Sequence, residues 1–180
     1  LVGIQGVLPG AEVQFNFLPA TDPTEYVDGL IGEILRAKET CGIVVTKVPF
    51  VVQRAIKDSG LPAVVHGSLY PSISGMAWVE QDNPGIARLI ADYVAAHNCT
   101  HVCALTREIM FPGDNVVLSE LGRLLGAAGY KAGNYSIAHL PDDRHAIMAE
   151  VAEIIHRNPT DLCLLCRSEG MAWVGLAFAI

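Results

Sequence analysis

The chain has 180 residues, of which 51% are hydrophobic and 17% charged, and its 12 basic and 19 acidic residues give a formal net charge of −7. This composition excludes a disordered chain, because there is enough apolar surface to offset the entropy of ordering, and it favours elements buried on both faces. Glycine, proline or charged residues interrupt every apolar run well before the roughly 20 residues that a membrane helix needs. Basic residues form no cluster that would hold a phosphate backbone. The sequence therefore predicts no membrane partner and no direct nucleic-acid contact by this stretch.

The five cysteines are odd in number and irregularly spaced, so they do not suggest a disulfide framework. The residues that follow Leu1 contain no basic segment and no cleavage signature of an exported protein. Both observations favour a cytoplasmic protein in a reducing environment. The cysteines are Cys41, Cys99, Cys103, Cys163 and Cys166.

Seven apolar runs predict β-strands. Short runs that are continuously apolar are typical of parallel strands covered by helices on both faces, although periodicity alone leaves a buried helix open as the alternative. The runs at 13–18 and 76–79 are weaker than the others. In chain order the predicted strands are residues 13–18, 42–46, 62–66, 76–79, 101–106, 135–140 and 161–166.

Three predicted helices lie between these strands, each with a start signal. Residues 22–25 offer an N-cap aspartate, a proline at the first helical position and a glutamate, which is a variant of the capping box. Asn83 and Pro84 start the second helix, and Asp142 or Asp143 starts the third, which ends at Asn158. Apolar residues in each helix recur at the spacing of one helical face. They are Val27, Ile31, Ile34 and Leu35 in the first helix, Ile86, Ile90, Tyr93 and Val94 in the second, and Ile147, Val151, Ile154 and Ile155 in the third.

Strands and helices alternate along the chain, which predicts the α/β class with parallel sheets. The favoured internal boundary is at residues 80–83, where a strand leads into a long helix. Two similar α/β halves on either side of this boundary would enclose a cleft. Ligands of such folds bind at the carboxyl ends of the strands, so the predicted ligand position is there.

Three stretches resemble the effector-binding module of the LacI/GalR family of bacterial transcription regulators, which has the periplasmic-binding-protein type I fold. CGIVV at 41–45 and SGLPAVV at 59–65 resemble the family's strand pair DGIIL and GIPVV. VEQDNPGIA at 79–87 and CTHVCAL at 99–105 resemble its crossover, VxxDNxxG leading to GHxxIAxL. PTDLCLLCRSEGMA at 159–172 resembles PxDAIxCxNDxMAxG. The motifs occur in the family's order and span nearly the whole chain.

The resemblance implies two similar parallel-sheet, Rossmann-like subdomains with a ligand cleft. Residues 1–80 would be the N-terminal α/β subdomain without its first strand, and residues 81–180 would be part of the C-terminal α/β subdomain. The strand that opens the family's module and the strand that follows residues 168–180 are missing, so we expect the module to be incomplete at both ends. The family's DNA-binding headpiece is not in this chain either. In the family an arginine within 116–129 clamps the effector, where this sequence offers Val117 or Ser119.

The implied function is the ligand-sensing domain of a cytoplasmic LacI-like regulator. It would bind a small-molecule effector, sugar-like or nucleobase-like, and modulate binding to operator DNA by a helix-turn-helix headpiece outside this chain. A homodimer is expected, with no cofactor, no metal and no enzymatic activity. One alternative is a periplasmic solute-binding protein of a transporter. Another is an enzyme on a flavodoxin-like α/β scaffold, which no acid–base pair or nucleophile in the sequence supports.

The candidate effector-binding residues follow the predicted strands or begin the next helix. Aromatic side chains among them have core packing as the alternative role. Asp82 and Glu169 have helix capping as the alternative. Arg107 is a candidate clamp for a carboxylate or phosphate, and the alternative for it is an exposed surface arginine without a ligand. The candidates are Thr46, Phe50, His66, Tyr70, Asp82, Arg107, Phe111 and Glu169.

Cys163 and Cys166 have the spacing of a redox or metal motif. In a strand, however, positions i and i+3 point to opposite faces, and no second pair nearby completes a zinc site. We therefore expect buried structural thiols.

Overall fold

The computed structural model describes residues 2–37, 41–141, 143–157, 160–167 and 169–178. The chain divides into two compact units, Leu1–Ile43 with Val48–Ala63, and Val44–Lys47 with Val64–Ile180. The subdomain boundary at residue 80 predicted from sequence is a different division, and it stays a prediction. None of the helices in the described ranges combines the length and apolar character that crossing a membrane requires.

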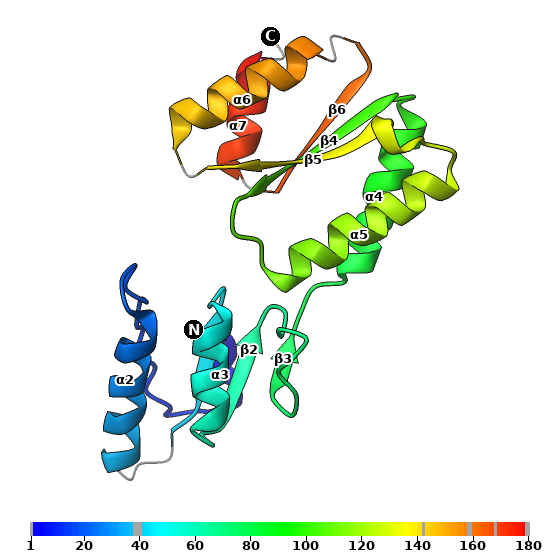
Figure 1. The fold of residues 1–180 in the computed structure, drawn as a ribbon. Helices are drawn as coiled ribbons and strands as arrows, with labels where there is room; N and C mark the ends of the chain where they lie inside the picture. The colour runs from blue at the N-terminus through cyan, green and yellow to red at the C-terminus, as the bar shows by residue number, and fades with distance from the viewer. Residues whose placement is uncertain (1, 38–40, 142, 158–159, 168, 179–180) are drawn as a thin grey trace. The chain divides into compact units, whose positions relative to one another are not determined.

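Within the described residues, the smaller unit contains three helices, α1 (Val2–Val7), α2 (Pro23–Ala37) and α3 (Phe50–Asp58) (Figure 1). Helix α2 begins at Pro23, as its proline at the first helical position predicts, and it packs against α3. Val27 and Ile31 are buried in α2, whereas Leu35 is 53% exposed. The apolar face of α2 is therefore narrower than predicted.

The predicted strand at 13–18 is wrong. These residues form no helix or strand in the structure, and Phe15 and Phe17 are exposed. A strand needs a neighbour that pairs with its backbone groups, and neither sheet in the described part of the chain places a strand beside this segment.

The first sheet has the order β1 (Ile43–Thr46), β2 (Ala63–His66), β3 (Ala77–Val79). Strands β2 and β3 run parallel, with Val65 opposite Trp78. The predictions at 42–46, 62–66 and 76–79 are confirmed.

The second sheet has β4 (His101–Arg107) at its centre, between β5 (Tyr135–Leu140) and β6 (Leu162–Cys166). Both pairings are parallel, and Val102 lies opposite Tyr135 on one side and Cys163 on the other. The short helix η1 (Ala132–Asn134) precedes β5. The predicted strands 101–106, 135–140 and 161–166 and the predicted α/β class with parallel sheets are confirmed.

Helices cover the second sheet on both faces (Figure 1). Val102 points into a core with α4 (Asn83–Ala96) and α5 (Pro112–Ala127). Leu105, three residues on, points into the opposite core with α6 (Arg144–Arg157) and α7 (Glu169–Phe178). The continuously apolar β4 is explained by this burial on both faces.

Two details of the predicted helices differ in the structure. Tyr93, predicted on the buried face of α4, is 59% exposed, and its ring stacks on His97 with 3.9 Å between the ring centroids. The start of α6 is confirmed at Asp143, whose carboxylate accepts a hydrogen bond from the backbone N–H of Ala146 at 2.8 Å.

Candidate functional site

The carboxyl ends of the three parallel strands of the second sheet meet at one edge. Strand β4 ends at Arg107, β5 at Leu140 and β6 at Cys166. Backbone hydrogen bonds continue past the strand ends, from the N–H of Glu108 to the carbonyl of Leu140 at 3.1 Å and from the N–H of Arg167 to the carbonyl of Leu105 at 3.2 Å. The residues after β4 and β6 are therefore fixed at the edge where ligands of parallel α/β sheets bind.

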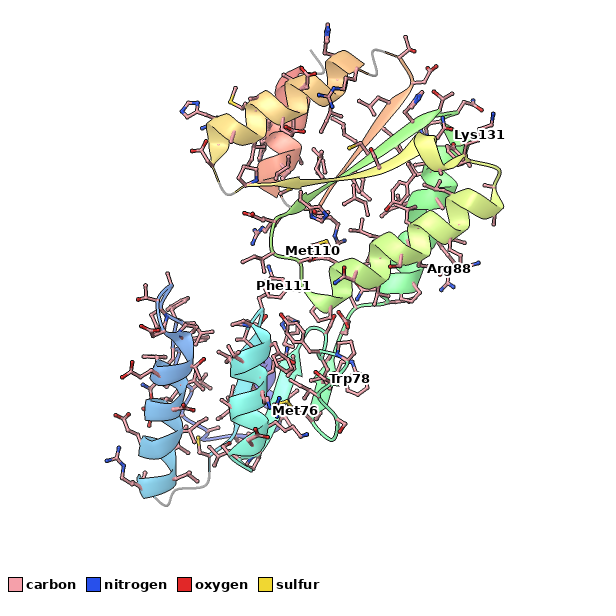
Figure 2. All side chains as sticks on the ribbon, in the orientation of Figure 1. Met76, Trp78, Arg88, Met110, Phe111 and Lys131 are labelled. Atoms are coloured by element: carbon pink, nitrogen blue, oxygen red, sulfur yellow. The ribbon has the colours of Figure 1, made fainter. Side chains whose placement is uncertain are left out.

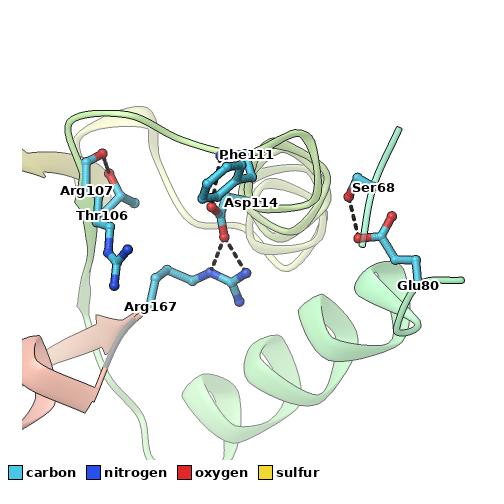
Figure 3. Close-up of polar contacts among 7 residues, drawn as sticks. All are labelled: Ser68, Glu80, Thr106, Arg107, Phe111, Asp114 and Arg167. Carbon is cyan, nitrogen blue, oxygen red and sulfur yellow. Dashed lines mark hydrogen bonds and ion pairs between the residues drawn. The ribbon is translucent and has the colours of Figure 1, made fainter. Parts of the chain in front are cut away.

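An ion pair connects the residue after β6 with the first turn of α5. Arg167 donates from Nε and Nη2 to Oδ1 of Asp114 at 3.0 and 2.5 Å (Figure 3). The side chains are only 18% and 24% exposed. The other carboxylate oxygen of Asp114 accepts a hydrogen bond from the backbone N–H of Phe111 at 3.2 Å, which caps α5. Both partners are thus held by charge-assisted hydrogen bonds on rigid elements.

A buried hydroxyl lies at the same edge. Thr106 is 1% exposed, and its Oγ1 lies 3.1 Å from Nδ1 of His139 and 3.3 and 3.4 Å from the carbonyl oxygens of Arg107 and Ala138. When the hydroxyl donates to a carbonyl, Nδ1 of His139 is the donor to Thr106 and Nε2 is the available acceptor. This contact links the ends of β4 and β5.

Four residues around the start of α4 form a group that we call the crossover cluster: Ser68, Glu80, Asn83 and Gly113. The hydroxyl of Ser68 donates to a carboxylate oxygen of Glu80 (Figure 3). Asn83 is 3% exposed, and its Oδ1 has no hydrogen-bond partner among the described residues. Gly113, in the first turn of α5, approaches these three side chains so closely that any Cβ there would clash with them.

The structure places the candidates of the first sheet as follows. Thr46 and His66 are the last residues of the adjacent strands β1 and β2, and both are exposed. Tyr70 lies half-buried in the loop after β2, and Phe50 is the half-buried first residue of α3. The end positions of Thr46 and His66 are as predicted, and the binding roles of all four stay predictions.

Asp82 is the N-cap of α4. Its carboxylate accepts a hydrogen bond from the backbone N–H of Gly85 at 2.9 Å, and it lies 3.8 Å from Nη2 of Arg88. The capping role weighed for Asp82 is confirmed, and a ligand role stays a prediction. Figure 2 shows Arg88 on α4, where it is exposed to solvent.

In the second half of the chain, Arg107 and Phe111 flank the loop between β4 and α5 (Figure 3). Arg107 is exposed and Phe111 is half-buried. Both lie at the strand edge that holds the Arg167–Asp114 pair (Figure 3). The side chain of Glu169, the first residue of α7, lies outside the described residues. Of the two positions at which the family's arginine is expected, Val117 is buried in the core and Ser119 is exposed.

Neither the Arg167–Asp114 pair nor the Thr106–His139 contact was predicted from sequence. Arg167 directly follows a predicted strand, so the rule that selected Arg107 also applies to it. Asp114 follows Pro112 by two residues, which is the pattern of a helix start. The pairing itself joins residues 53 positions apart, and no local pattern contains it.

All five cysteines are free thiols. Cys163 packs with the α4–α5 core and Cys166 with the α6–α7 core, which confirms the prediction that they point to opposite faces. Burial raises the pKa of the Cys163 thiol to about 11, with smaller contributions from Cys99 and Cys166. Burial also raises the pKa of Tyr135 to about 12 and the pKa values of Cys103 and Cys166. These thiols are therefore protonated at neutral pH.

The fold is that of LacI-type regulator domains and of the periplasmic-binding-protein type I class. A LacI-family regulatory protein from Chloroflexus aggregans superposes with a TM-score of 0.78 at 15% identity, over 99% of this chain and 63% of that one. A PurR-family regulator from Vibrio parahaemolyticus has a TM-score of 0.73 at 13% identity, over 98% and 67%. An ABC transporter solute-binding protein from Clostridium phytofermentas with bound L-rhamnose has a TM-score of 0.63 at 13% identity, over 84% and 50%.

The predicted resemblance to the LacI family is thus confirmed at the level of the fold. This chain spans between half and two thirds of the length of these three structures. Comparison with family models and with curated proteins finds no match.

Proposed function

We propose that this chain is the ligand-sensing domain of a LacI-like transcription regulator and that it binds a small molecule at the carboxyl ends of its strands. The observation that carries the proposal is the Arg167–Asp114 pair, fixed at that edge of the second sheet. Structural neighbours that are regulators or a sugar-bound binding protein support it. We infer a binding role rather than a catalytic one, since the neighbours named above are regulators and a solute-binding protein.

The ligand chemistry that best suits this edge is neutral and hydroxyl-rich. The guanidinium of Arg167 is already paired with the carboxylate of Asp114, so the two charges offset each other. An anionic ligand that took the arginine would leave Asp114 as an unpaired and largely buried carboxylate, which is costly. A sugar hydroxyl can donate to Asp114 and accept from Arg167 at the same time. A nucleobase-like ligand is the second class, with stacking on Phe111.

We also propose the remaining candidate residues as parts of the effector site. Arg107 would contact the ligand from the end of β4, and Glu169 from the start of α7. From the first half of the chain we assign Thr46, Phe50, His66, Tyr70 and Asp82.

Sensing requires that the ligand bind one conformation of the regulator better than another. A coupling of about 1–3 kcal/mol is typical of such systems. In a cytoplasmic homodimer, the ligand would then change the affinity of two headpieces for operator DNA. The headpieces are outside this chain, in accord with its acidic net charge of −7.

Thermal-shift and calorimetric titrations test ligand binding. The panel is neutral monosaccharides, L-rhamnose among them, with their phosphorylated analogues and free nucleobases. A neutral sugar at about 100 times its Kd should add about 2.7 kcal/mol of stability, and its phosphorylated analogue should add much less. Stabilisation by phosphorylated sugars alone would refute the ligand class.

A pair of variants tests the position of the site. Arg107→Ala should weaken binding of the active sugar at least tenfold without unfolding the protein. Arg123→Ala is the matched control, because Arg123 is an exposed arginine that pairs with Glu120 on α5. Equal affinities of wild type and Arg107→Ala would show that this edge of the sheet is not the site.

The alternative is a solute-binding protein of a transporter, which the L-rhamnose-bound neighbour favours. Both functions use the same ligand chemistry. They differ in what precedes this domain in the complete protein.

A further inference from the structure

We propose that Cys99 and Cys163 form a redox-active thiol pair, which a low-molecular-weight disulfide such as oxidised glutathione converts into an intramolecular disulfide.

Backbone hydrogen bonds join the segments that carry the two cysteines, just before β4 and at the start of β6. The N–H groups of Thr100 and His101 both donate to the carbonyl of Asp161, at 3.0 and 3.2 Å. The segment that carries Cys99 is thereby fastened to the residue two positions before Cys163. The hydroxyl of Tyr130 donates to the carbonyl of Cys99 at 2.7 Å and fixes it from the other side.

The two side chains also point to the same face of the sheet. Cys99 and Cys163 are partly buried and pack against the same core, which contains Val102 and residues of α4 and α5. Cys163 lies directly opposite Val102. The neighbouring Cys99 is one of the smaller causes, after burial, of the raised pKa of Cys163. Two neighbouring thiols on one face of a sheet are the arrangement from which a disulfide can form.

The neighbouring cysteines are not equivalent partners. Cys103 and Cys166 pack into the core on the opposite face of the sheet, and Cys103 is only 3% exposed. The sheet itself thus separates them from Cys99.

The reaction is two consecutive thiol–disulfide exchanges. The thiolate of Cys99 attacks one sulfur of oxidised glutathione, whose S–S bond breaks and releases one glutathione thiolate. Cys163, which is protonated at neutral pH, then loses its proton to the medium, and its sulfur attacks the sulfur of Cys99 and releases the second glutathione. The two protein thiols lose two protons and two electrons, and oxidised glutathione is reduced to two molecules of glutathione.

This disulfide would lie at the amino-terminal ends of β4 and β6. Arg167 of the Arg167–Asp114 pair follows the carboxyl end of β6, so oxidation should leave the candidate ligand site intact. A link between residues this far apart in sequence stabilises the folded state by restricting the unfolded chain. Oxidation should therefore raise Tm by several degrees, on the order of 5 °C.

The test is incubation of the folded protein with oxidised glutathione, alkylation of the remaining thiols and peptide mapping without reduction. Trypsin leaves Cys99 with Cys103 in peptide 89–107 and Cys163 with Cys166 in peptide 158–167. The mapping is therefore done in a Cys103→Ala, Cys166→Ser background, where only one link can join these two peptides. Cys41→Ser, which changes a partly exposed thiol outside the pair, is the matched control.

We expect linked peptides 89–107 and 158–167 in this background, retained with Cys41→Ser and lost with Cys99→Ser or Cys163→Ser. In Cys163→Ser the product should stop at a glutathione adduct on Cys99. Linkage of either cysteine to Cys41, or no linkage while Cys41 is oxidised, would overturn the proposal. Linkage that forms equally fast in urea would also overturn it, because native proximity would then play no part. The wild-type protein, mapped by tandem mass spectrometry, must give the same Cys99–Cys163 bond.

Discussion

Gly113 lies in the first turn of α5, where alanine would normally stabilise a helix. A Cβ at this position would lie 2.6 Å from the hydroxyl oxygen of Ser68, 2.7 Å from a carboxylate oxygen of Glu80 and 2.9 Å from the amide nitrogen of Asn83. All three distances are shorter than real Cβ contacts, and Asn83 and Gly113 are buried. Gly113→Ala should therefore force the crossover cluster apart.

The size of the effect follows from two opposing contributions. Overpacking of a well-packed site costs about 1–3 kcal/mol, whereas replacing a helical glycine by alanine gains up to about 1 kcal/mol. Gly126→Ala in the same helix gives the second contribution alone, because no atom lies within 4 Å of its added Cβ. The two variants should differ by about 2 kcal/mol, or about 4–8 °C in Tm for a chain of this size.

The assay is thermal and urea unfolding of both variants, followed by circular dichroism. Gly113→Ala should unfold below wild type and Gly126→Ala at or above it. Ser68→Ala removes the closest oxygen, so the double variant with Gly113→Ala should recover part of the loss in a double-mutant cycle. A Gly113→Ala protein as stable as Gly126→Ala would refute the close approach of α5 to Ser68 and Glu80.

Three further predictions follow from single contacts. Asp114→Asn and Arg167→Met should each lower the free energy of unfolding by about 1–3 kcal/mol, with a coupling energy above about 0.5 kcal/mol in a double-mutant cycle by urea unfolding; strictly additive effects would mean that the pair does not interact. Asp82→Ala should cost about 1 kcal/mol through the lost N-cap bond to Gly85, whereas an unchanged urea midpoint would contradict the capping role. Because the pKa of Cys163 rises from 9.0 to about 11 on folding, its contribution to stability is complete below pH 9 and is lost as the pH rises toward 11. Cys163→Ser should therefore flatten the fall of Tm between pH 9 and 11, and Cys41→Ser should leave that fall as steep as in wild type.

Much of the fold could be predicted from sequence because its signals are local. A strand buried on both faces, such as β4, needs continuously apolar residues, and a helix that begins on a capping side chain, such as α4 or α6, shows that residue at its start. The helices α3 and α5 were not predicted, although Val117, Leu121 and Leu125 are spaced along one buried face of α5. The strand predicted at 13–18 is the opposite error. Its apolar pattern is visible in the segment itself, but whether a neighbouring strand pairs with it depends on distant parts of the chain.

The candidate site was predictable only in part. The rule that ligands bind at carboxyl strand ends selected Arg107 and Phe111, which lie at the edge that the structure defines. It could not reveal that Arg167 is neutralised by Asp114, because that contact depends on how β6 and α5 meet in space. The expected chemistry of the site changes with this contact, from an arginine that clamps an anion to a neutral pair suited to hydroxyl groups.

The central claim is that this domain senses a ligand on behalf of a DNA-binding protein. The most direct test is the N-terminal sequence and intact mass of the native protein, isolated from its own cell, together with the reading frame upstream of Leu1. We predict a helix-turn-helix segment joined to this domain and retained in the mature protein. A cleaved signal sequence in its place would contradict the account and assign the domain to a transport receptor.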